Sequence, residues 1–168
     1  MGMYPAGNLV KISPTVSGTA YTEGDIIFAK QEIKGAVPSR GGCSILHSVT
    51  MLVEGALVAD EFTLLFFDND TALGVAAASA MATVTYAQFQ AASCIGSIEA
   101  DMNGMSEIVA AGNTRLWRNS DEDSRSELFI KAAEGKTSIW VAMFQQTDTL
   151  DLVDTDSIDL TFGFKYLG

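Results

Sequence analysis

Phe62-Thr63-Leu64-Leu65-Phe66-Phe67 is the stretch that decides the fold of this chain. Its apolar side chains occupy odd and even positions alike, so both faces of an extended chain would be apolar. Such a run is typical of a central strand that is covered on both sides. The polar triplet Asp68-Asn69-Asp70 ends the run. We therefore predict a central strand here, with other parts of the protein packed on both of its faces.

A longer strand precedes this run. The segment from Ser44 to Val53 shows the two-residue alternation of a half-buried strand. The turn Glu54-Gly55-Ala56 would then return the chain into the central strand and complete a hairpin. The residues predicted to share one face of the longer strand are Ile45, Val49, Met51 and Val53.

Further strands are predicted on both sides of this hairpin. Each is an apolar or alternating run bounded by residues that favour turns. The last of them alternates apolar and polar residues most regularly. The further predicted strands are residues 25–29, 94–100, 127–131, 137–144 and 157–166.

The remaining segments are predicted to be loops. Residues 71–92 are rich in alanine and do not alternate, so we interpret them as a long loop with one short helix around residues 86–91. Glycine and proline predict a loop at 34–42, and polar turn residues predict another at 112–123. An acidic loop is expected before the last strand.

Seven or eight strands without a sustained helix or a repeat indicate an all-β fold. We predict an antiparallel β-sandwich, jelly-roll-like, with two four-stranded sheets and one long Ala-rich loop or short helix. Residues 1–20 are assigned to an N-terminal arm and a first edge strand, and residues 21–168 to a single sandwich domain. The arm itself, residues 1–9, has little reason to fold alone.

The composition combines two opposing features. Of the 168 residues, 48% are hydrophobic and only 18% are charged, yet the formal net charge is -11. This charge disfavours nucleic acid and anionic membranes as partners, because phosphate contacts need Lys and Arg. The apolar content fits either a permanently docked, oligomeric subunit or simply a well-filled core, and both alternatives stay open here.

Two cysteines, Cys43 and Cys94, are too few for a disulfide framework, and we interpret both as small buried residues of a reducing compartment. The N-terminus lacks the pattern of a secretory signal. The apolar run 74–84 is too short to cross a bilayer. We therefore expect the protein to be made and kept inside a cell.

The acidic residues do not form a recognisable metal site. Asp68-Asn69-Asp70 resembles the start of a calcium loop, but Ala72 stands where the fifth ligand is needed. Four acids near the C-terminus could line a calcium site, although a solvated acidic loop is the preferred interpretation. These four are Asp148, Asp151, Asp154 and Asp156. We predict no metal, cofactor or catalytic residue.

The single histidine, His47, excludes most nucleophilic and zinc chemistry. A zinc site from His47, Cys43 and Cys94 would lack a fourth ligand, and no Gly-x-Ser-x-Gly elbow is present. We interpret His47 as an interface or half-buried residue, and we expect that the protein is not an enzyme.

Four residues are candidates for an interface. Trp117 is flanked by Arg115 and Arg118, an amphipathic mixture that is enriched at protein interfaces. The alternative is a Trp that folds onto its own domain. Tyr4, in the N-terminal arm, is the fourth candidate. Trp140 has apolar neighbours on both sides and is predicted to lie in the core.

Four features follow one another along most of the chain. They are the stretch Tyr21 to Asp25, the Gly-rich turn Arg40-Gly41-Gly42-Cys43-Ser44-Ile45, the run Leu65-Phe66-Phe67-Asp68-Asn69, and the strand at Ile139-Trp140-Val141 with the final alternating strand. In this order they resemble the decoration, cement or head-auxiliary proteins of tailed phages. Those proteins are small β-sandwiches with no catalytic motif to carry over.

The resemblance implies a virion structural protein. Its partner would be the major capsid protein, its location the outer capsid surface after assembly in the host cytoplasm, and its state a homo-oligomer, most plausibly a trimer. Two alternatives stay open: a phage tail, fibre or adaptor component, and a carbohydrate-binding β-sandwich module. The latter would need a platform of exposed aromatic side chains.

Overall fold

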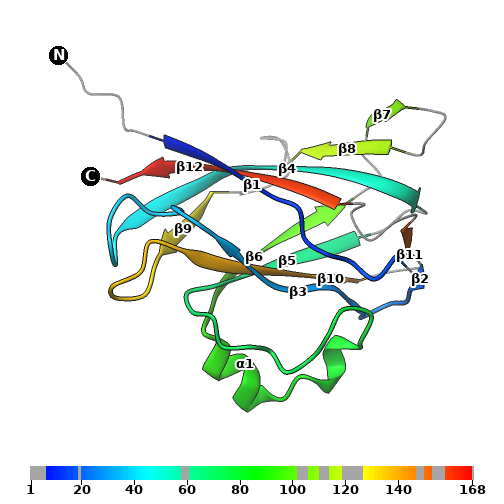
Figure 1. The fold of residues 1–168 in the computed structure, drawn as a ribbon, viewed down its shortest axis with the longest axis horizontal. Helices are drawn as coiled ribbons and strands as arrows, with labels where there is room; N and C mark the ends of the chain where they lie inside the picture. The colour runs from blue at the N-terminus through cyan, green and yellow to red at the C-terminus, as the bar shows by residue number, and fades with distance from the viewer. Residues whose placement is uncertain are drawn as a thin grey trace.

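The computed structural model describes residues 7–18, 20–57, 61–101, 106–109, 114–118, 127–146, 150–152 and 158–167. It is an antiparallel β-sandwich, as predicted, with one short α-helix packed outside it (Figure 1). The larger sheet contains β1 (Gly7–Ile12), β2 (Ala20–Tyr21), β4 (Cys43–Leu57), β7 (Ser106–Val109), β8 (Thr114–Arg118), β9 (Leu128–Lys131), β11 (Leu150–Leu152) and β12 (Ile158–Tyr166). The smaller sheet contains β3 (Ile26–Ile33), β10 (Ile139–Gln145), β5 (Glu61–Phe67) and β6 (Cys94–Asp101).

The strand pairing is that of one long hairpin rolled up on itself. β1 pairs with β12, β3 with β10, β4 with both β9 and β8, and β5 with β6, always antiparallel. The short strands β2, β7 and β11 are left aside here, and β8 and β9 count as one position. The first strand then pairs with the last, the second with the second-last, and so on to the adjacent pair β5 and β6. It is the jelly-roll arrangement. The sheets hold eight and four strands, so the prediction of two four-stranded sheets was wrong.

The long strand β4 organises the larger sheet. It pairs with β12 and β11 along one edge, and with β9 and β8 along the other. The strand continues to Leu57, so the predicted turn at Glu54-Gly55-Ala56 is wrong. Gly and Ala can lie within a paired strand, because their backbone groups still form the hydrogen bonds to the neighbouring strand.

A bulge at His47 shifts the alternation within β4. Gly163 of β12 pairs with Ser48, but the next residue, Phe164, pairs with Leu46. Leu46 is therefore buried, while Ile45 lies on the outer side with only partial burial. The predicted common face of Ile45 with Val49, Met51 and Val53 is wrong for Ile45, because one extra residue in a strand reverses the facing of everything beyond it.

The main core fills the space between the two sheets. Phe62, Leu64 and Phe66 of β5 enter it from one side, and β12 supplies alternate residues from the other. The rings of Phe66 and Phe162 meet edge to face with centroids 6.0 Å apart, a favoured geometry for aromatic pairs. The regular alternation predicted for the last strand is confirmed, because Ile158, Leu160, Phe162 and Phe164 are all buried.

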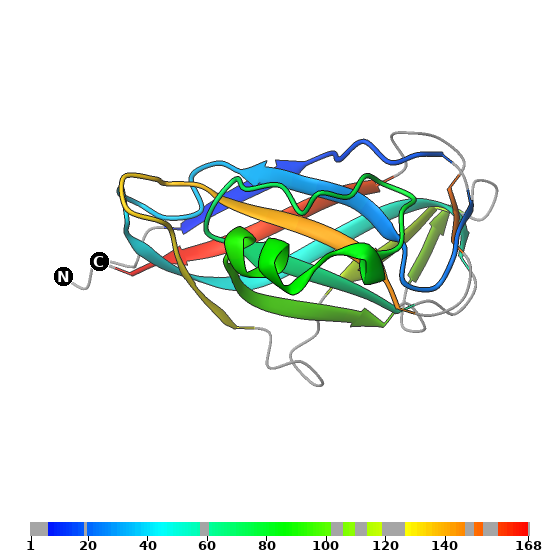
Figure 2. The same ribbon diagram turned by 90° about the horizontal axis from the view of Figure 1, so that it is seen from below.

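A second hydrophobic cluster lies on the outer face of the smaller sheet. Residues 68–93, here called the covering segment, run across this face between β5 and β6 (Figure 2). The segment includes a 3-10 turn (Met81–Thr83) and α1 (Tyr86–Ala92), close to the predicted helix. The buried members of the cluster are Leu65, Phe67, Leu73, Ala92, Trp140 and Ala142. Both faces of the central strand are covered, as its two-sided apolar pattern predicted. Trp140 is a core residue, also as predicted.

Polar contacts cap the helix within the covering segment and attach both ends of the segment to the smaller sheet. The Thr85 side chain accepts a hydrogen bond from the backbone N–H of Gln88, whose side chain returns to the Thr85 backbone and completes a capping box. Lys30 of β3 donates through Nζ to the carbonyl oxygens of Thr71 (2.9 Å) and Ala92 (3.2 Å). The same ammonium lies 4.1 Å from the centre of the Phe67 ring. One lysine therefore holds both ends of the segment to the smaller sheet.

Three other expectations differ from the structure. Strand β8 lies within the predicted loop 112–123, and β11 lies within the predicted acidic loop. Both are short strands whose pairing with β4 outweighs a polar, turn-rich composition. Cys43 and Cys94 are free thiols, and both are half-buried rather than buried. Residues 7–9, predicted to belong to the arm, are the start of β1.

Candidate functional site

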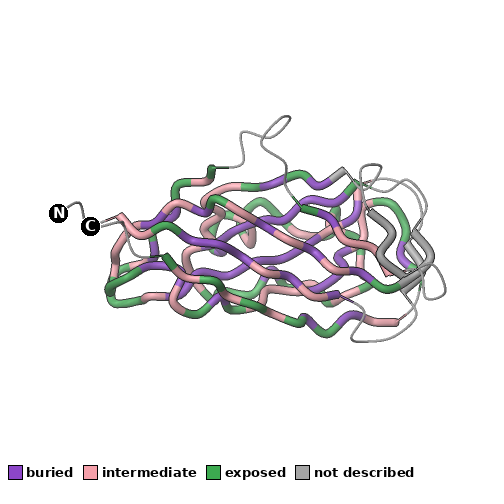
Figure 3. Tube along the Cα trace, turned by 90° about the horizontal axis from the view of Figure 1, so that it is seen from above, coloured by how far each residue is buried: buried purple, intermediate pink, exposed green. Residues whose placement is uncertain are grey.

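The larger sheet turns one face to the core, and no described segment crosses its outer side. On this side β1, β12, β4 and β8 form the upper surface of the molecule in Figure 1 and face the viewer in Figure 3, while β9 lies below β4 in Figure 1. We call this outer side of β1, β12, β4, β8 and β9 the bare face. Its solvent-facing residues alternate with buried ones along each strand. They are Leu9, Lys11, Ile45, His47, Ser48, Thr50, Leu52, Glu54, Leu116, Arg118, Phe129, Lys131, Asp159, Thr161 and Lys165.

The bare face has an apolar centre near one end. Lys165, Ile45 and Phe129 lie side by side in one cross-strand row over β12, β4 and β9. Leu9, on β1, is diagonal to Lys165. Phe129 is 56% exposed and Leu9 is 72% exposed. Leu9 and Phe129 lie on different strands, with β12 and β4 between them, and partly buried Ile45 lies next to Phe129. Exposed apolar side chains on one face are a candidate contact surface for another molecule.

The charge of the bare face is opposite to that of the chain. Its five strands carry the exposed cations Lys11, Lys131, Lys165 and Arg118. Against these four cations stand the carboxylates of Asp159 and Glu54 and, directly before β9, that of Glu127, which is exposed and alternates with Phe129 and Lys131. The whole chain has a formal net charge of -11. The bare face is therefore a weakly basic, partly apolar surface on a strongly acidic molecule.

One of these carboxylates, Asp159, is paired within the protein, and the pair also takes up one of the four cations, Lys11. Asp159 forms an ion pair with Lys11, with 2.9 Å between Nζ and Oδ2, and accepts a hydrogen bond from the hydroxyl of Ser13. Partial burial acts to raise the pKa of Asp159, but the Ser13 hydroxyl and the Lys11 ammonium outweigh it and hold the pKa below its usual value. These contacts tie β1 to β12 across the bare face.

A glycine allows the histidine to lie flat on the bare face. A Cβ at Gly163 would lie 3.1 Å from atoms of the His47 ring and would collide with the Ser48 hydroxyl. The His47 side chain, extruded by the bulge, therefore occupies the space above Gly163. His47 is exposed. Its predicted role at an interface stays a prediction, but its position on the bare face is compatible with it.

The structure separates the four predicted interface residues. Trp117 is 8% exposed and packs in the main core opposite Met51, so the alternative of a Trp folded onto its own domain describes its position. Arg115 shares the inward-facing side of β8, and its buried Nε has no hydrogen-bond partner among the described residues. Arg118 is exposed on the bare face. Tyr4 lies outside the described residues.

Sequence reasoning did not find Leu9, Phe129 or the lysines around them. Each belongs to a different strand, and only the register of β1, β12, β4 and β9 brings them together. One signal was present in the sequence. Phe129 alternates with Leu128 and Ile130, so in a strand it has to face away from them.

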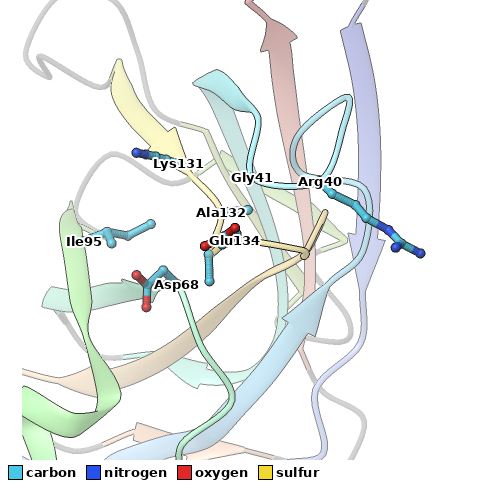
Figure 4. Close-up of a pocket in the computed structure, with 8 residues that line it drawn as sticks. Arg40, Gly41, Asp68, Ile95, Lys131, Ala132 and Glu134 are labelled. Atoms are coloured by element: carbon cyan, nitrogen blue, oxygen red, sulfur yellow. The ribbon is translucent and has the colours of Figure 1, made fainter.

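A cavity of about 660 Å³ opens beside β9, where the turns at Arg40 and Glu134 approach the ends of β5 and β6, and Lys131 of the bare face also lines it. In Figure 4 the side chains of Arg40 and Lys131 extend away from the middle of this group, while the carboxylates of Asp68 and Glu134 lie nearer to it. The lining residues are Arg40, Gly41, Asp68, Ile95, Lys131, Ala132, Ala133 and Glu134. Two carboxylates alone offer too few ligands for a tightly bound metal ion.

The described residues contain no group of three or more His, Cys, Asp or Glu side chains placed to hold a metal ion. Asn69, in the triplet that resembled a calcium loop, instead donates to Ala91 O (3.0 Å) and accepts from the Thr71 N–H (2.9 Å). Asp148, Asp154 and Asp156 lie outside the described residues. Within the described part of the chain, no helix has the length and apolar character that crossing a bilayer requires.

No known protein family and no curated protein matches this sequence. Several solved structures similar to it are of viruses. They include turnip yellow mosaic virus (11% identity, TM-score 0.29, covering 98% of this chain and 82% of that one) and the native virion of Kashmir bee virus at neutral pH (10%, 0.32, 96% and 70%). The VP2 subviral particle of infectious bursal disease virus is a third (10%, 0.35, 95% and 40%). At TM-scores of this size the likeness carries no argument about this chain's activity, which has to be inferred from its own surfaces.

Proposed function

We propose that this chain is a non-enzymatic structural protein of a virion, a decoration or cement protein that binds the outer surface of a capsid and stabilises the head. The observation that carries the proposal is the bare face. The chain covers the outer side of its smaller sheet with its own residues 68–93, whereas no described segment covers the outer side of the larger sheet, where Leu9 and Phe129 are exposed. A second protein that docks there would complete the burial.

The mechanism of stabilisation would be mass action. A protein that binds only the assembled lattice lowers the free energy of that state by an amount that grows with its concentration over the dissociation constant. A rigid jelly roll suits this role because its shape changes little on binding. The major capsid protein is the proposed partner, and the proposed state of the chain is a homo-oligomer, most plausibly a trimer, assembled in the host cytoplasm.

The resemblance in sequence order to tailed-phage decoration proteins supports the proposal, as does an apolar yet acidic composition. A phage tail, fibre or adaptor component would share these features but would be present in far fewer copies.

Quantitative mass spectrometry of particles purified from the source tests the proposal. A lattice-wide decoration protein is expected at a copy number of the order of one per major capsid subunit, by analogy with saturating mass-action binding. A few copies per particle would favour a tail or vertex component instead. Complete absence from the particle would overturn a virion role.

A further inference from the structure

The bare face combines apolar residues with exposed cations. Its apolar centre consists of Leu9, Ile45 and Phe129, on three different strands, with Lys165 of β12 between Leu9 and Ile45. Lys131 follows Phe129 on β9, and Lys11, which pairs with Asp159, and Arg118 lie farther along the strands. Apolar contacts together with charged, solvated residues are usual at protein–protein interfaces.

We propose that the bare face is the surface through which this protein docks, and that its partner is a protein surface that carries carboxylates together with apolar residues. This inference rests on the proposed function, which supplies a capsid subunit as the partner. It adds which face of the sandwich is used and what chemistry the partner presents there.

Charge complementarity decides the chemistry of the partner. On a chain with formal net charge -11, generic electrostatics would repel an acidic partner at long range. At short range the cations of the bare face attract the carboxylates of such a partner. This attraction favours the orientation in which the bare face is turned toward the partner. A basic partner would instead be directed to the other, acidic surfaces and would leave Leu9 and Phe129 uncovered.

Nucleic acid is a poorer occupant of the same surface. Phosphate binding depends on many closely spaced cations, whereas these four are distributed over β1, β8, β9 and β12 with Asp159 among them. The apolar residues at the centre have no counterpart on a phosphate backbone. A protein surface satisfies both the apolar residues and the cations.

The direct test is zero-length carbodiimide cross-linking of particles purified from the source, followed by peptide mass spectrometry. This reagent joins a lysine amine to a carboxylate only when the two are in contact. We expect cross-links from Lys131 and Lys165 to Asp or Glu of another protein in the particle. Lys34, which lies 3.9 Å from a Glu32 carboxylate oxygen, and Lys136 are exposed loop lysines outside the bare face. They serve as internal controls and should give no cross-link to another protein.

The outcomes separate the two proposals. If the chain is in the particle but only Lys34, Lys136 or other lysines cross-link to a partner, the docking face is wrong while the virion role stands. Cross-links between Lys131 or Lys165 and acids of a second copy of this chain would also overturn a capsid partner. If the chain is missing from the particle, the proposed function fails and the docking inference fails with it.

Charge reversal provides a binding test. The double substitution Lys131→Glu with Lys165→Glu should weaken binding to particles stripped of the chain by about tenfold or more and reduce its dependence on salt. The matched control, Lys34→Glu with Lys136→Glu, makes the same change in net charge and should bind within about twofold of wild type. Equal weakening by both pairs would show a general charge effect and overturn the inference.

The apolar centre is tested with a second matched pair. Phe129→Ser removes an exposed ring from the bare face, and Tyr86→Ser removes an exposed ring from α1, where Tyr86 is 81% exposed. Only Phe129→Ser should weaken binding, by about tenfold. If particle binding survives but binding of a labelled DNA duplex is lost in the Lys131 and Lys165 variant, nucleic acid is the occupant and the inference is wrong.

Discussion

The outer faces of the two sheets both carry large apolar side chains, but they differ in whether a described segment of the chain covers them. The smaller sheet presents Leu65, Phe67 and Trp140 outward, and the chain buries them under residues 68–93. The larger sheet presents Leu9 and Phe129 outward among lysines, and no described segment covers them. The difference lies in composition. Large apolar residues that lie together on an outward face are covered within the chain, whereas exposed apolar residues interspersed with lysines on the other face remain available to a partner.

The comparison predicts that the two faces differ most in their contribution to stability. Phe67→Ala should lower the free energy of unfolding by about 3–5 kcal/mol, because it leaves a cavity between the smaller sheet and the covering segment. Phe67 is fully buried and its ring meets that of Phe89 edge to face at 6.0 Å. Urea denaturation followed by fluorescence measures the change. A loss below about 1 kcal/mol would mean that the covering segment is not part of the cooperative fold.

The covering segment should also depend on its helix cap. Thr85→Ala removes the side-chain acceptor for the Gln88 N–H and should cost about 1 kcal/mol. Thr85→Ser keeps a hydroxyl in place and should recover most of that loss. Thermal or urea unfolding of the two variants provides the measurement. Equal destabilisation by Ala and Ser would show that the methyl contact, rather than the capping box, is what matters.

The titration of Lys30 should make the free energy of unfolding depend on pH. Burial lowers the pKa of Lys30 from 10.5 to about 8, although nearby Asp68, Asp70 and Cys94 act in the opposite direction. Between these two values the unfolded chain binds more protons than the folded one, so the free energy of unfolding should rise with pH across this window. The effect is smaller than that of the cap because solvent screens a half-exposed ammonium.

The matched variant for this pH effect is Lys30→Met, which keeps a long apolar stem without a titrating group. The difference in melting temperature between wild type and variant should shift in favour of wild type from pH 8 to pH 10.5. Using the difference cancels the titration of other lysines and tyrosines. Parallel curves for the two proteins would show that the pKa of Lys30 is not depressed in the folded state.

The smallest effect on stability is expected on the bare face. Phe129→Ser should change the free energy of unfolding by no more than about 0.5 kcal/mol, because the ring is already 56% exposed. The same urea experiment as for Phe67→Ala gives the value. A loss comparable to that of Phe67→Ala would erase the contrast between the two faces and imply that Phe129 is buried within the protein itself.

Much of the fold could be predicted because the signals are local. The two-sided apolar run at 62–67, the alternation at 158–166 and the short helix near 86–91 are all found where they were expected. Strands β7, β8 and β11 were not predicted, since each is short. β8 and β11 pair with β4, and β7 pairs with β8, so these strands depend on pairing with residues distant in the sequence. The position of Trp117 follows from the same pairing, which turns it toward the core opposite Met51.

The candidate interaction surface was less predictable than the fold. Leu9, Ile45, Phe129 and Lys165 are far apart in the sequence, and the bulge at His47 decides that Ile45 faces outward with them. A single inserted residue reverses the side-chain direction of a strand, and nothing local in the sequence marks where that insertion falls.

The sequence by itself determined which strands are apolar on both sides, that the fold is an antiparallel β-sandwich, and that a short helix lies in the alanine-rich segment. These are properties of neighbouring residues, since periodicity and turn residues act within a few positions. Only the tertiary structure decided that the alanine-rich segment covers the smaller sheet and that exposed apolar and basic residues gather on the larger one. Both depend on the register between distant strands, which is set by the packing of the whole core rather than by any one segment.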